Sequence, residues 1–136
     1  MQLKIVGILL ITLSFIHVIF PKYFNWKTEL AALSLINRQM MYVHTFFIAL
    51  VVLLMGMLCL TSSGELLQTQ LGNKIVLGLA IFWGIRLFFQ FFGYSKQHWK
   101  RKKFETIIHV LLSILWVYIS TVFFYTWWAH EHCFVC

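Results

Sequence analysis

Apolar and polar positions divide the chain into four long apolar stretches separated by short polar segments. The stretches run from Leu3 to Phe20, Gln39 to Leu60, Lys74 to Tyr94 and Thr106 to Trp128. A helix needs about 20 apolar residues to cross the hydrocarbon core of a bilayer, and each stretch comes close to that length or exceeds it. None shows the period-two alternation of barrel strands, and backbone groups in lipid must be paired internally. The pattern predicts an all-α integral membrane protein, a four-helix transmembrane bundle that forms a single domain over residues 1–136.

The first stretch has the position of a cleaved secretory signal, because Lys4 precedes its apolar run. Pro21 and Lys22 follow the run directly, however, and no pair of small residues marks a cleavage site. We therefore expect this stretch to remain as a transmembrane helix. Pro21 is the only proline in the chain and is predicted to end that helix.

The segment between the first and second stretches has helical spacing of its own. Asn25 can cap a helix that begins at Trp26, and apolar residues then recur every three or four positions. The apolar positions are Trp26, Leu30, Leu33 and Ile36. This spacing predicts a short amphipathic helix from Trp26 to Arg38 that lies at the membrane interface.

Composition excludes an ordinary soluble domain. The 136 residues are 61% hydrophobic and only 11% charged, and the mean hydropathy is +0.83. Little of the chain is left for soluble structure beside the four stretches. A lipid bilayer is therefore the expected surrounding of most side chains.

The positions of basic residues predict the orientation of the chain in the membrane. Eight of them lie in the segments that follow the first and third stretches: Lys22, Lys27, Arg38, Lys96, Lys100, Arg101, Lys102 and Lys103. Only Lys4 and Lys74 lie at the other ends of the stretches. The positive-inside rule places both basic segments in the cytoplasm and both termini outside, in the cell (inner) membrane. Contact with anionic lipid at the cytoplasmic face then accounts for the net charge of +7 without a nucleic-acid partner.

A layer of polar residues is predicted just inside the cytoplasmic ends of the stretches. At about 1.5 Å per residue, five side chains fall at similar depth, and every stretch contributes at least one. They are His17, His44, Arg86, Gln90 and His109. Ionisable residues inside a span are costly, so they tend to face the bundle interior and to mark functional sites.

This layer has the groups that a redox cofactor needs. Imidazoles from different helices of a bundle can hold a haem iron or a transition metal, and an arginine can pair with a haem propionate. The chain has no Cys-x-x-Cys-His, which excludes covalent attachment and leaves haem b or a transition metal as the expected cofactor. The structural alternative is that these residues reach the headgroups, with His17 and His109 hydrogen-bonded to Ser14 and Ser113.

The last eight residues, 129–136, form a predicted extracytoplasmic tail rich in cysteine and histidine. Its candidate metal ligands are His130, His132, Cys133 and Cys136. Thiolates and imidazoles suit zinc or copper(I), and the two cysteines can also form a redox disulfide, which the outer compartment favours. The alternative is an inert chain terminus.

Three functions therefore stay open. The first is a membrane protein that binds haem or a transition metal through the polar layer. The second is an outward-facing protein that handles thiols or soft metals with the tail. The third is a non-catalytic membrane subunit or scaffold, as a homo-oligomer or as part of a larger membrane complex. The motifs of nucleotide hydrolysis, serine hydrolysis and common metalloproteases are absent from the sequence, so enzymatic activity is left undecided.

Overall fold

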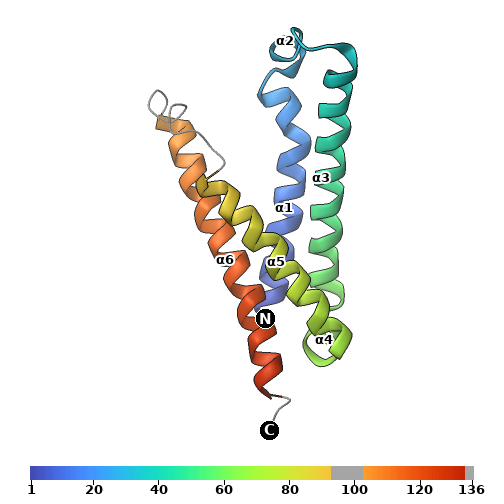
Figure 1. Ribbon diagram of the computed structural model, residues 1–136, viewed down its shortest axis with the longest axis vertical. Coiled ribbons are helices and arrows are strands. Elements are labelled where there is room, and N and C mark those ends of the chain that lie inside the picture. Colours follow the sequence, from blue (N-terminus) through green and yellow to red (C-terminus); the bar gives the residue numbers. More distant parts are fainter. Residues whose placement is uncertain (93–102, 134–136) are drawn as a thin grey trace. The chain divides into compact units, whose positions relative to one another are not determined.

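The computed structural model describes the backbone of residues 1–92 and 103–133 and the side chains of residues 1–92 and 107–132 (Figure 1). The regular elements of these residues are all helices, as the sequence predicted. In order they are α1 (Gln2–Tyr23), α2 (Trp26–Glu29), α3 (Leu35–Thr61), α4 (Ser63–Gln68), α5 (Gln70–Phe92) and α6 (Lys103–Cys133). Four of them, α1, α3, α5 and α6, are long and apolar enough to cross a membrane. The all-α fold with four spanning helices is confirmed.

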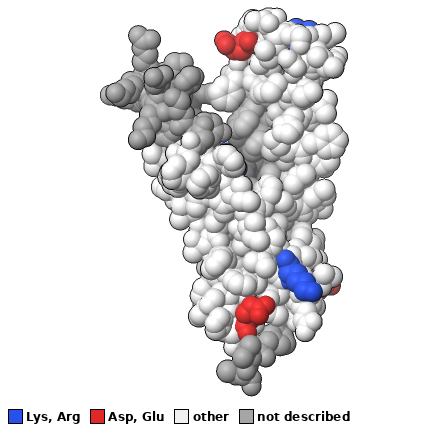
Figure 2. All heavy atoms as spheres, in the orientation of Figure 1, with Lys and Arg blue, Asp and Glu red and all other residues white. Residues whose placement is uncertain are grey.

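The described helices form two compact units. Unit 1 comprises Met1–Ser63 and contains α1, α2 and α3, whereas unit 2 comprises Gly64–Cys136 and contains α4, α5 and α6. Each unit is built on one pair of long helices that pack along each other, α1 with α3 and α5 with α6. Apolar side chains are exposed on all four long helices, as expected of surfaces that face lipid. On the visible face in Figure 2, charged side chains lie near the ends of helices.

In unit 1, small residues let α1 and α3 approach closely. A Cβ atom added to Gly7 would lie 2.9 Å from the carbonyl oxygen of Gly56, and one added to Gly56 would lie 2.9 Å from that of Gly7. Two helical turns beyond Gly7 on α1, Ser14 Oγ donates a buried hydrogen bond of 2.7 Å to the Ala49 carbonyl of α3. Small residues and interhelical hydrogen bonds are the usual means of association between membrane helices. Unit 1 is therefore a tightly packed helical hairpin.

The connection between α1 and α3 differs from the sequence prediction in two respects. The first helix passes Pro21 and ends at Tyr23, with the following turn closed by the bond from Phe24 N to Phe20 O at 2.9 Å. The predicted helix from Trp26 to Arg38 is divided, because Trp26–Glu29 form α2 and residues 35–38 already belong to α3, so the predicted single helix was wrong. Helix α2 ends at Glu29, the chain continues in tight turns with bonds such as Leu33 N to Leu30 O at 3.1 Å, and the extended backbone at Ser34 (ψ 152°) directly precedes α3.

Asn25 precedes α2 at the predicted capping position, but its side chain makes no capping hydrogen bond. Its backbone is left-handed, at φ 48°, a conformation that asparagine tolerates better than most residues. The Thr28 hydroxyl instead donates to the Asn25 carbonyl at 3.0 Å. Asn25 therefore serves mainly as the bend that separates α1 from α2.

In unit 2, α5 and α6 pack through a core of apolar and aromatic side chains. The buried core residues of these helices are Val76, Leu79, Ala80 and Trp83 on α5 and Trp116, Ile119, Val122 and Phe123 on α6. The Trp83 and Trp116 rings stack at 4.9 Å between centroids and at an angle of 20°. The last helix continues to Cys133, five residues beyond its predicted end at Trp128, so much of the predicted tail is helical.

Candidate functional site

Arg86 and Gln90 lie one turn apart on α5, and their side chains are in direct contact. The Arg86 guanidinium donates from Nη1 to Gln90 Oε1 at 3.1 Å. Gln90 is only 3% exposed, and Arg86 is partly buried. Residues four apart on a helix share a face, which is why the sequence spacing brings these two together.

The other described contact of Arg86 is with an aromatic ring of α6. The guanidinium carbon lies 5.0 Å from the centroid of Trp116, within the range of a cation–π interaction. Trp116 in turn stacks on Trp83, which lies one turn before Arg86 on α5. The arginine is thus held by neutral partners on two helices.

His109 joins the same group from the start of α6. Its ring meets the backbone of Gln90 and lies close enough to interact electrostatically with Arg86. The Ser113 hydroxyl, one turn later, donates to the His109 carbonyl at 2.8 Å and lies 3.3 Å from His109 Nδ1. We call the side chains of Trp83, Arg86, Gln90, His109, Ser113 and Trp116 the Arg86 cluster.

In the Arg86 cluster, hydrogen-bond donors and positive charge are not matched by acceptors and negative charge. Neither Trp83 Nε1 nor Trp116 Nε1 has a hydrogen-bond acceptor among the described residues, although both atoms are buried. Within the described part of the chain, the partners of Arg86 are likewise neutral. The cluster therefore contains one positive charge and two free N–H donors, but no carboxylate.

Sequence reasoning found Arg86, Gln90 and His109, and it placed Trp83 on the same helix face as Arg86 and Gln90 without giving it a role, but it missed Trp116. A signal for both tryptophans was present, because Trp83 precedes Arg86 by three residues and Trp116 follows Ser113 by three, so each shares a helix face with a polar residue. Tryptophans are so common in this chain that the pattern alone did not separate Trp116 from the interfacial ones.

The two remaining residues of the predicted layer lie in unit 1. His17 is partly buried on α1. Its ring nitrogen Nδ1 lies 2.8 Å from the Leu13 carbonyl oxygen, so Nε2 points away from Leu13. His44 is exposed on α3, and among the described residues it has no hydrogen bond or ring contact. The structure does not bring these two rings into contact. A layer shared by all four spans stays a prediction.

The described tail residues lie in the last turns of α6, which extends to Cys133. His132 Nδ1 lies 2.9 Å from the Trp128 carbonyl, and its ring packs on Trp128 at 4.2 Å. Two residues along a helix correspond to a rotation of about 200°, so His130 and His132 point to opposite sides of α6. Cys136 and the side chain of Cys133 lie outside the described residues. Among those that are described, no three His, Cys, Asp or Glu side chains are grouped to hold a metal ion.

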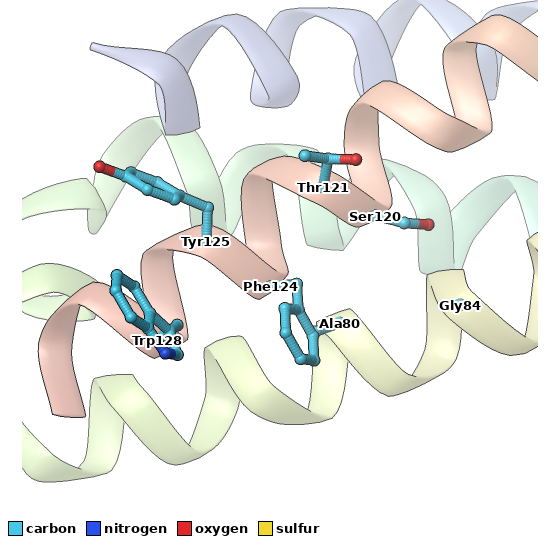
Figure 3. Close-up of a pocket in the computed structure, with 7 residues that line it drawn as sticks. All are labelled: Ala80, Gly84, Ser120, Thr121, Phe124, Tyr125 and Trp128. Atoms are coloured by element: carbon cyan, nitrogen blue, oxygen red, sulfur yellow. The ribbon is translucent and has the colours of Figure 1, made fainter. Parts of the chain in front are cut away.

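A groove of about 600 Å³ runs along the α5–α6 pair (Figure 3). It is lined by Ala80, Gly84, Ser120, Thr121, Phe124, Tyr125 and Trp128. Gly84 and Arg86 are two residues apart and so point to nearly opposite sides of α5. On α6, by contrast, the groove residue Ser120 lies one turn after Trp116 on the same side of the helix. The groove contains none of the predicted site residues.

No protein-family profile, curated protein or solved structure matches this chain. Its function must therefore be argued from its own residues.

Proposed function

We propose that this multi-pass membrane protein binds an acidic, membrane-soluble ligand in the Arg86 cluster. The observation that carries the proposal is the partly buried guanidinium of Arg86, whose described partners are all neutral. A charge in a membrane span costs several kcal/mol unless it is paired or hydrated. An acidic group of a ligand supplies the missing partner.

The unpaired tryptophan donors point to the same kind of ligand. An indole N–H left without an acceptor loses about 1–3 kcal/mol of hydrogen bonding when it is buried. A carboxylate has two oxygens and can accept a bidentate contact from an arginine together with further N–H groups. The two indole donors of the Arg86 cluster have no acceptor among the described residues, and a carboxylate provides one.

Haem b is the specific ligand we propose. It carries two propionates for Arg86, and its iron takes an imidazole, which His109 supplies within the same cluster. A transition metal held by His109 is the second candidate, and the thiol or soft-metal function of the tail is the third.

Two substitutions in the Arg86 cluster test the proposal. Gln90→Glu places a carboxylate beside the guanidinium, so we expect the internal ion pair to replace the ligand and occupancy to fall by about tenfold or more, which corresponds to ~1.4 kcal/mol. Arg86→Gln should also abolish binding, whereas Arg86→Lys should keep part of it, because lysine retains the charge without the planar fork. Lys74→Gln is the matched control, since it removes a positive charge from the other end of α5.

The measurement is ligand content after purification of the full chain in detergent. An absorption spectrum identifies haem by its Soret band, metal analysis identifies a bound metal, and native mass spectrometry identifies any other acidic molecule. Haem that is lost in His109→Ala supports the specific ligand, and another acid that is lost in Arg86→Gln supports the general proposal alone. If the wild-type chain retains no acidic ligand, or retains it equally in Gln90→Glu, the scaffold function replaces this one.

A further inference from the structure

The connection between α1 and α3 holds three basic side chains at one end of unit 1. Lys22 lies in the last turn of α1, Lys27 in α2 and Arg38 in the first turn of α3. Because α1 and α3 pack along each other as a hairpin, the end of α1 and the start of α3 lie at the same end of the unit (Figure 1). Three positive charges are therefore concentrated in one short connection.

None of these three cations is paired within the described residues. Lys22 and Lys27 are exposed and Arg38 is partly buried, and no ion pair or hydrogen bond of their side chains is described. Glu29 is the only carboxylate side chain of unit 1, and it is exposed and unpaired as well. An arginine of this kind can pack its stem against the protein and leave its planar head to bind an external anion.

Two aromatic side chains bring α2 to the face of α3 that bears Arg38. The Trp26 and Tyr42 rings meet edge to face at 5.4 Å between centroids. Tyr42 follows Arg38 by one helical turn, so the two share a face of α3. Lys27 directly follows Trp26 in α2. Tryptophan and tyrosine are enriched where a membrane meets water, so this pair indicates the interface at this end of unit 1.

Large apolar side chains are exposed beside these charges. Phe24 is 51% exposed, Leu35 62% and Ile36 67%. A segment that exposes both apolar and basic side chains is suited to the membrane interface, with the apolar groups among acyl chains and the cations among headgroups. A water-soluble anion would leave the apolar side chains in water. The surface therefore favours a lipid over free phosphate or an acidic protein.

We propose that Lys27 and Arg38, with Lys22 beside them, bind the phosphate of an anionic phospholipid in the adjoining leaflet. The arginine fork fits phosphate oxygens, and the two lysines add point charges. An anionic headgroup balances the unpaired positive charge, whereas the headgroup of phosphatidylcholine brings a cation of its own. This surface lies in unit 1 and does not depend on the ligand of the Arg86 cluster.

Native mass spectrometry of the full chain, purified with equal amounts of phosphatidylglycerol and phosphatidylcholine, tests the proposal. We expect the chain to retain phosphatidylglycerol in preference. Lys27→Gln and Arg38→Gln should each lower this preference about fivefold, the contribution of one basic residue near an anionic surface. Arg38→Lys should keep part of it, because the charge remains. Lys4→Gln is the matched control, since it removes an exposed charge from the opposite end of α1.

Thermal unfolding distinguishes a lipid from a water-soluble anion. Phosphatidylglycerol should raise the Tm of the wild-type chain, and phosphatidylcholine, inorganic phosphate and soluble poly-glutamate should not. Lys27 is exposed, so Lys27→Gln keeps the test valid if Arg38→Gln folds poorly. A loss of preference in Lys27→Gln no larger than in Lys4→Gln would overturn the proposal. A rise in Tm that phosphate or poly-glutamate produces as strongly as phosphatidylglycerol would overturn it too, in favour of a soluble anion or an acidic protein.

Discussion

Gly7 and Gly56 decide at the residue scale how closely α1 and α3 can pack. A Cβ atom on Gly56 would lie 2.8 Å from Ile11 Cγ1 and 2.9 Å from the Gly7 carbonyl oxygen. Both distances are too short for a carbon atom, and the carbonyl belongs to the backbone of the other helix. The side chain of alanine therefore cannot enter without moving α1 away from α3.

We predict that Gly56→Ala destabilises the protein by about 1–3 kcal/mol, the usual cost of overpacking a well-packed contact. Gly84→Ala is the matched control, because nothing lies within 4 Å of its added Cβ atom and alanine is the better helix former. Thermal unfolding in detergent compares the two. Equal stability of Gly56→Ala and Gly84→Ala would show that the close approach of the two backbones is not needed.

At the scale of single elements, α6 is longer than its apolar pattern indicates. The apolar run ends near Trp128, yet the helix continues to Cys133 because residues 129–133 include neither glycine nor proline and their backbone can keep its helical hydrogen bonds. The bond between Asn73 and Glu131 adds a contact to α5 within this extension. Hydrophobicity therefore marks where α6 can lie in lipid, and it does not mark where the helix stops.

The tail of α6 leads to a prediction about its cysteines. If the C-terminus lies outside the cytoplasm, Cys133 and Cys136 should resist an impermeant maleimide until a reductant is added, because an oxidising compartment favours their disulfide. Protection that a chelator removes would instead indicate a bound metal. Cys59 is fully buried and serves as the internal control that should stay unlabelled. Immediate labelling of the tail without either treatment would show that it is inert.

Orientation is a property of the whole molecule, and the charge asymmetry of the sequence predicts it. Eight basic residues in two connecting segments stand against Lys4 and Lys74. A reporter that is active only outside the cytoplasm should be active when fused after Cys136 and silent when inserted near Lys100. The reverse pattern would place the tail in a reducing compartment and would remove the basis for its disulfide.

The fold class could be predicted because the apolar stretches are long and few. The predicted spans and the observed helices overlap over most of their length, since transfer of apolar side chains into lipid depends on composition and length and needs no tertiary contact. The connection between α1 and α3 was predicted less well. The apolar spacing from Trp26 to Ile36 favoured one helix, but turns after Glu29 and the extended backbone at Ser34 divide it.

The candidate site could be predicted only in part. Arg86, Gln90 and His109 were found because polar residues inside a span are rare, a property visible in the sequence. The sequence did not show that Trp116 covers the guanidinium or that two indole donors lack an acceptor among the residues the structure describes. Those facts depend on how α5 and α6 are rotated toward each other.

The sequence by itself determined that this chain is helical, that four helices can cross a membrane, and which polar residues lie within them. These properties follow from the free energy of placing each side chain in lipid or in water, which acts on residues one at a time. The tertiary structure alone decided which helices pair, how Gly7 meets Gly56, and that Asn73 reaches Glu131 across 58 positions. In lipid, helices associate through close packing and hydrogen bonds between particular atoms, and such contacts are not encoded in hydrophobicity.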